Sequence, residues 1–118
     1  MTIEQIAARL TDLCKQGQYE TAQKELYAQD AVSIEPEGAP GLQSVKGLDN
    51  IVAKGHQFQG MVEAVHSSTV DGPVIAGNHF SVAADSDVTM KGMGRHTMSE
   101  IAVYKVDNGK IVSEQFIY

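Results

Sequence analysis

The chain has 118 residues and a formal net charge of −6, with 42% hydrophobic and 20% charged residues. This composition is typical of one globular domain, and no stretch is long and apolar enough to span a bilayer. The nine Lys and Arg residues are scattered singly. They form no patch that would neutralise phosphates, so we expect neither nucleic acid nor a membrane as a partner. The first residues lack the apolar run of a secretory signal, which favours a cytoplasmic location.

Metal and disulfide chemistry have little support in the sequence. Cys14 is the only cysteine, which excludes an intrachain disulfide and a cysteine-based zinc site. Its place on an apolar helical stripe favours a small buried hydrophobic residue over a nucleophile. The four histidines show neither a HExxH motif nor paired spacing on one element. They are His56, His66, His79 and His96. We therefore expect no metal and no cofactor.

Helical patterns come first along the chain. Thr2 followed by Gln5 is a capping-box pattern, and apolar residues at helical spacing continue from it until Gly17. A second helix is predicted over about residues 18–28, with Tyr19 on its buried face and Tyr27 as a further candidate for that face.

A short strand and a third helix follow. The segment "AVSIEP" reads as a strand closed by proline, and residues 37–47, rich in Gly and Pro, read as a loop. The third helix is predicted to begin near Leu48 and to end around Gly60.

From Met61 onward the pattern changes to alternation with a period of two. We predict strands over residues 62–70, 74–90, 96–106 and 111–118, with "DGP" as the first turn and "KGMGR" as a Gly-rich connection. Asn108-Gly109 between two apolar runs predicts a tight hairpin. Helices followed by an antiparallel meander indicate an α+β domain with a strongly curved sheet over helices.

Three segments carry a family resemblance: "LYAQDAVSIEPEG", "VKGLDNI" and "VDNGKIVSEQFIY". In this element order the chain resembles the SnoaL-like branch of the NTF2-like superfamily over residues 1–118, as a single domain. The resemblance implies a cone-shaped α+β barrel, with three N-terminal helices packed in a strongly curved antiparallel or mixed sheet. It also implies a homodimer that associates through the sheet. The superfamily includes ketosteroid isomerases, polyketide cyclases, dehydratases and transport factors, so it does not determine the activity.

Glu35 falls where ketosteroid isomerases place the carboxylate that shuttles a proton. Two of their other residues have no counterpart: the oxyanion tyrosine falls at Leu10, and the protonated aspartic acid falls at Ala102 or Val103. The resemblance therefore supplies a base position without the usual stabilisers of an enolate.

Strand alternation, together with the resemblance, gives the expected lining of a pocket. If Tyr104 faces inward, residues two apart along the same strand share its face. By the same alignment His66 faces the cavity, whereas His79 faces away. The side chains that face inward on the last strand would be those of Val112, Glu114, Phe116 and Tyr118. The expected substrate-binding residues are Val88, Met90, Met98, Glu100, Glu114, Phe116 and Tyr118.

The catalytic candidates are Glu35 as general base and His66 or Tyr104 as proton donor. Each also has a structural interpretation: a solvated strand-end carboxylate, a half-buried histidine and a core tyrosine. The first hypothesis is thus proton transfer on a small, largely apolar carbonyl compound, of the isomerase or cyclase type. The alternatives are a non-catalytic module that binds a small ligand, and a dimeric interaction protein whose own side chains fill its interior.

Overall fold

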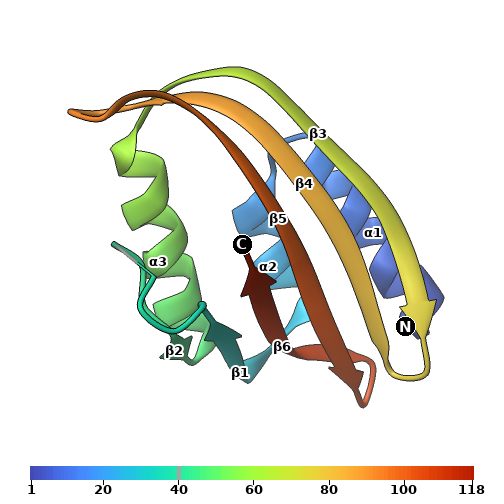
Figure 1. Cartoon of the computed structure of the whole chain (residues 1–118). Coiled ribbons are helices and arrows are strands. Elements are labelled where there is room, and N and C mark those ends of the chain that lie inside the picture. Colours follow the sequence, from blue (N-terminus) through green and yellow to red (C-terminus); the bar gives the residue numbers. More distant parts are fainter. Residues whose placement is uncertain (40) are drawn as a thin grey trace.

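The computed structural model describes residues 1–39 and 41–118; Pro40, within the predicted loop, lies outside the described residues. The elements follow one another along the chain as helices first and strands mostly afterwards (Figure 1). They are α1 (Ile3–Lys15), α2 (Tyr19–Leu26), β1 (Tyr27–Ile34), β2 (Val45–Lys46), α3 (Leu48–Met61), β3 (Val62–Ala76), β4 (His79–Met90), β5 (Gly94–Asp107) and β6 (Lys110–Ile117).

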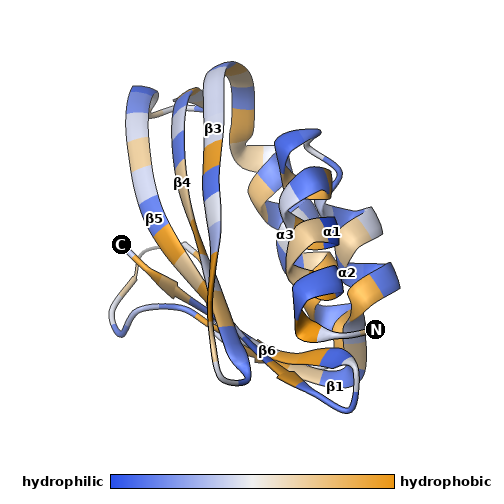
Figure 2. Ribbon diagram, turned by 90° about the vertical axis from the view of Figure 1, so that its right-hand side faces the viewer, coloured by the Kyte–Doolittle hydropathy of each residue, from blue (hydrophilic) through white to orange (hydrophobic). Residues whose placement is uncertain are grey.

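The strands form one sheet in the order β2-β1-β6-β5-β4-β3. β1 and β6 run parallel and the other neighbours run antiparallel, so the sheet is mixed. The predicted α+β class is confirmed. The sheet bends strongly but stays open, with β2 and β3 at its edges, and all three helices lie on its concave side (Figure 2).

The core lies between the helices and this concave face. Ile6 and Leu10 of α1 are at most 1% exposed, as are Phe80 of β4 and Ile111 of β6. The rings of Phe80 and Tyr104 stack with centroids 4.8 Å apart. These side chains alternate with exposed ones along each strand, which fixes which residues face the helices.

The first helix agrees with the sequence, whereas the second is shorter than predicted. Thr2 and Gln5 form the capping box of α1. Helix α2 ends at Leu26, and Tyr27 begins β1 opposite Ile111 of β6. Tyr27 is buried as a strand residue, and Tyr19, expected to be buried, is 43% exposed.

The predicted turn "DGP" is wrong. Strand β3 continues through it to Ala76, and the hairpin turn is Gly77-Asn78. The pairing with β4 shifts register between Asp71 and Val74. A proline has no N–H to donate to a strand pair, and a local bulge accommodates it without ending the strand.

The predicted Asn108-Gly109 hairpin is confirmed, with φ of 50° and 73° at the two residues. A bulge follows it, because Val106 pairs with Ile111 while Lys105 pairs with Ser113. Val112 is the extra residue, so Ile111, and not Val112, occupies the core.

No helix within residues 1–39 and 41–118 is long and apolar enough to cross a membrane.

The bulge in β6 gives a direct test of side-chain direction. Ile111→Ala is expected to lower the free energy of unfolding by about 2–5 kcal/mol, because it leaves a cavity at a fully buried position. The matched change Val112→Ala should cost less than about 1.5 kcal/mol, since that side chain is only half-buried. Urea unfolding of both variants measures the difference. Equal losses would contradict the bulge.

Candidate functional site

Strand β1 directs Ser33 and Glu35 toward the helices. Ser33 is 0% exposed and Glu35 8%, whereas Ile34 between them is 37% exposed and lies on the opposite face. The backbone N–H of Glu35 donates to Ser44 Oγ at 2.9 Å. The loop after β1 thus fixes the backbone at the carboxylate.

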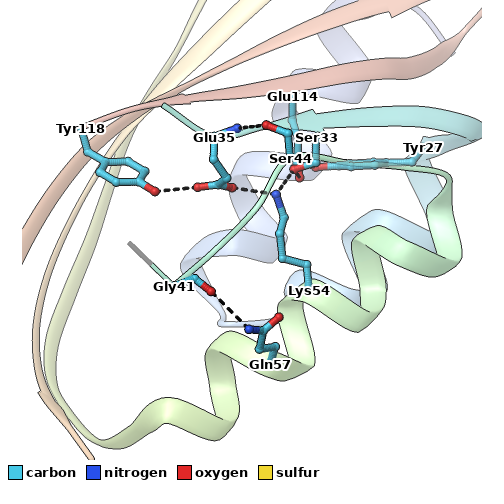
Figure 3. Close-up of polar contacts among 9 residues, drawn as sticks. All are labelled: Tyr27, Ser33, Glu35, Gly41, Ser44, Lys54, Gln57, Glu114 and Tyr118. Carbon is cyan, nitrogen blue, oxygen red and sulfur yellow. Dashed lines mark hydrogen bonds and ion pairs between the residues drawn. The ribbon is translucent and has the colours of Figure 1, made fainter. Parts of the chain in front are cut away.

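Lys54 of α3 is the buried partner of this carboxylate (Figure 3). Its Nζ lies 2.7 Å from Glu35 Oε2 and 2.6 Å from Ser33 Oγ. It also lies 5.5 Å from the centroid of the Phe116 ring, within the range of a cation–π contact. The two charged side chains are only 8% and 4% exposed. An ion pair this buried survives because each charge is hydrogen-bonded as well as paired.

Glu114 of β6 lies on the other side of Ser33. Ser33 Oγ donates to Glu114 Oε2 at 2.6 Å, and the Tyr27 hydroxyl donates to Glu114 Oε1. Burial raises the pKa of Glu114, and the two hydrogen bonds oppose this rise. Burial also raises the pKa of Tyr27. Tyr27, Glu114, Ser33, Lys54 and Glu35 therefore form one continuous buried chain of polar contacts (Figure 3).

Tyr118 covers the remaining oxygen of Glu35. Its hydroxyl donates to Glu35 Oε1 at 2.7 Å, while 55% of Tyr118 remains exposed. Partial burial and the Glu35 carboxylate raise the pKa of Tyr118.

Glu100 is a third inward carboxyl and differs from the other two. It lies on the concave face of β5, two residues from Ala102, and it is partly exposed. No hydrogen bond or ion pair of its side chain is found within the described part of the chain. Burial raises its pKa to about 7, and the charges of Glu35 and Glu114 add to the rise.

The two predicted proton donors lie elsewhere. His66 falls at a register shift of β3, and its Nε2 contacts Thr89 Oγ1 at 2.7 Å. Thr89 follows the inward Val88 and faces away from the helices, so the predicted inward orientation of His66 is wrong: the bulge reverses it. Tyr104 does face inward but is 5% exposed and stacks on Phe80, as a core residue does.

The other expected lining residues share the concave face at different depths. Val88 and Met90 are 3% and 8% exposed and belong to the packed interior. Met98 and Phe116 are partly exposed and lie nearer to a ligand that approaches from solvent. His79 is exposed and faces away from the helices.

Lys54 and Ser33 were missed by the sequence reasoning. Lys54 stands three residues after Ile51 and four before Phe58, on the face of α3 that those apolar residues define. The sequence signal was a lysine on the buried face of an amphipathic helix. Because an unpaired buried charge is too costly, such a lysine indicates a buried acidic partner.

A surface depression borders this network. An open depression of about 370 Å³ reaches Lys54 from the side of loop 41–45, where Gln57 donates to the Gly41 carbonyl at 3.2 Å.

Cys14 is partly buried, and burial raises the pKa of its thiol to about 12. Within residues 1–39 and 41–118, no three His, Cys, Asp or Glu side chains are placed to hold a metal ion.

Comparison with known proteins places this geometry in a family. The profile of the SnoaL-like domain matches residues 1–118. The chain belongs to the SnoaL-like family. No curated protein sequence matches it significantly.

Solved structures agree with this assignment. A protein from Mesorhizobium loti, provisionally described as a SnoaL-like polyketide cyclase, is 38% identical, covers 100% of both chains and superposes with a TM-score of 0.93. An NTF2-like protein of unknown function from Burkholderia pseudomallei is 17% identical over 100% of this chain and 92% of its own, with a TM-score of 0.80. A protein from Catenulispora acidiphila with a ketosteroid isomerase-like fold, solved in complex with trimethylamine, is 22% identical over 84% of this chain and 73% of its own, with a TM-score of 0.63. The last two share the fold alone with this SnoaL-like protein.

The ion pair predicts a strong coupling between Lys54 and Glu35. Lys54→Met leaves a buried carboxylate without its cation, and we expect a loss of about 3–5 kcal/mol in the free energy of unfolding. The double variant with Glu35→Gln removes both charges and should recover most of that loss. Urea unfolding of the two single variants and the double variant measures the coupling. Additive losses would contradict a direct pair.

Proposed function

We propose that the concave face binds a small, largely apolar carbonyl compound and transfers a proton on it, with Glu35 as the base. The observation that carries this proposal is that two of the three inward carboxyls, Glu35 and Glu100, lie in unlike environments. Glu35 is buried beside the Lys54 ammonium, whereas Glu100 has no partner among the described residues and a pKa of about 7. Carboxyls held in different protonation states are a common basis for acid–base catalysis.

The two carboxyls would take separate roles. An ionised Glu35, fixed by Lys54 and the Ser44 contact, accepts the proton from the carbon beside the carbonyl group. A protonated Glu100 donates a hydrogen bond to the carbonyl oxygen as it gains negative charge. Met98 and Phe116, which are partly exposed, supply apolar contact for the rest of the compound. The Glu100 carboxyl would then serve in place of the donors that Leu10 and Ala102 cannot supply.

A non-catalytic ligand-binding module is the second candidate. Leu10 and Ala102 are buried and apolar, 1% and 4% exposed. By the resemblance, the donors of a ketosteroid isomerase fall at Leu10 and at Ala102 or Val103. The Catenulispora relative was solved with a bound small molecule. Native mass spectrometry separates the candidates, because a module of this kind retains a compound that it does not transform.

Proton transfer is testable with a plain ketone. Replacement of the α-hydrogens of cyclohexanone by deuterium in D₂O, followed by NMR, should be accelerated by the protein. Glu35→Gln should reduce this rate by about 10²- to 10⁴-fold, the usual contribution of a positioned base. The rate should fall above pH about 7, because Glu100 then loses the proton that it donates.

Glu100→Gln is the matched control for this pH dependence. A glutamine keeps a hydrogen-bond donor but cannot titrate, so the fall above neutral pH should disappear. Exchange that Glu35→Gln leaves unchanged would refute the proposed base.

We also propose that two copies associate through the convex face of the sheet. Ile101 and Ile117 are cross-strand partners there and are 47% and 51% exposed, and Ile34 on the same face is 37% exposed. Exposed apolar groups gathered on one face of a sheet are typical of an interface.

A charge on this face should prevent the association. Ile101→Lys is expected to give the mass of one protomer by light scattering at micromolar concentration, while the unchanged protein gives twice that mass. Val74→Lys is the control, because Val74 is also exposed, at 68%, but lies near the β3–β4 turn. A single-protomer mass for the unchanged protein would exclude the dimer.

A further inference from the structure

Access to Glu35 is closed on both of its oxygens. Oε2 faces the Lys54 ammonium and Oε1 accepts from the Tyr118 hydroxyl, and the side chain is only 4% exposed (Figure 3). A ligand cannot contact this carboxylate unless one of the two partners leaves.

The two partners differ in how firmly the fold holds them. Lys54 is 8% exposed, and it is also hydrogen-bonded to Ser33 and lies against the Phe116 ring. Tyr118 is 55% exposed, and its hydroxyl makes no other hydrogen bond within the described residues. A side chain with so little packing moves at low cost, so Tyr118 is the partner that can leave.

We propose that Tyr118 occupies the place of the ligand's hydrogen-bond donor on Glu35 and is displaced when the ligand binds. The displaced group defines what can replace it. The ligand presents an O–H or an acidic C–H donor to Oε1 and places an apolar body where the tyrosine ring had been. Tyr118 is thereby a specificity-determining residue: a compound without a donor gains too little to displace it. This inference rests on the proposed role of Glu35 as the group that meets the ligand.

The test removes the tyrosine side chain and measures binding of a free molecule with the same structure. Binding of 4-methylphenol, the free analogue of the tyrosine side chain, is measured by NMR chemical-shift titration of the Tyr118→Ala variant. Toluene has the same shape but no hydroxyl. We expect 4-methylphenol to bind the variant about tenfold or more tightly than toluene, and more tightly than it binds the unchanged protein, whose own Tyr118 competes.

Two further variants identify the site. In the double variant with Tyr118→Ala and Glu35→Gln, the affinity for 4-methylphenol should fall toward the affinity for toluene, because the charged acceptor is gone. Tyr19→Ala is the matched control: it also removes a partly exposed tyrosine, 43% exposed, but one that makes no contact with Glu35. It should bind 4-methylphenol no better than the unchanged protein does. Equal affinity of Tyr118→Ala for 4-methylphenol and toluene, or equal affinity of Tyr19→Ala and Tyr118→Ala for 4-methylphenol, would overturn the proposal.

These results are separate from the ketone assay. If 4-methylphenol binds as expected while cyclohexanone exchange is absent, displacement of Tyr118 stands and proton transfer fails. If Tyr118→Phe abolishes exchange and Tyr118→Ala shows no preference for 4-methylphenol, Tyr118 transfers the proton itself and is not displaced.

Discussion

The buried pair of Lys54 and Glu35 is the interaction on which the rest of the site depends. It joins helix α3 to the end of strand β1, across the loop that separates them in the sequence. Burying two charges costs more than their attraction returns unless further polar groups contact them. Ser33 and Tyr118 supply those contacts, and the Phe116 ring lies beside the ammonium. Ser33 and Tyr118 thus meet the need of a buried ion pair for further polar contacts.

One ammonium cannot neutralise three carboxyls. Lys54 contacts Glu35 directly and reaches Glu114 only through Ser33, so the burial of Glu114 is only partly offset and its pKa is raised. Glu100 has no cation beside it among the described residues, and the charges of the other two carboxyls add to the effect of its own burial. The unequal distribution of one positive charge thus gives three glutamates three different environments on one face.

Local patterns predicted the first helix and the last hairpin, because each depends on nearby residues: a capping box and Asn108-Gly109. The expected position of Glu35 at the pocket came from the family resemblance. The errors lie where a strand gains one residue. Bulges put His66 outside and exchanged Ile111 for Val112 in the core, and alternation alone contains no information on where a bulge falls. Lys54 was missed because its partner is 19 positions away in the sequence, so only tertiary packing makes a buried charge acceptable there.

The fold and the chemistry are separable in this protein. Members of a fold can keep a carboxylate at the end of β1 and still differ in what surrounds it. By the family resemblance, the two isomerase donors fall at Leu10 and at Ala102 or Val103, and both Leu10 and Ala102 are buried in the core. A carboxyl appears instead at Glu100, two residues from Ala102 on the same strand face, where its environment raises the pKa to about 7. A donor displaced by one inward position would meet a ligand at a different depth. A reaction on this scaffold would therefore have its own geometry, and a substrate cannot be inferred from the shared fold.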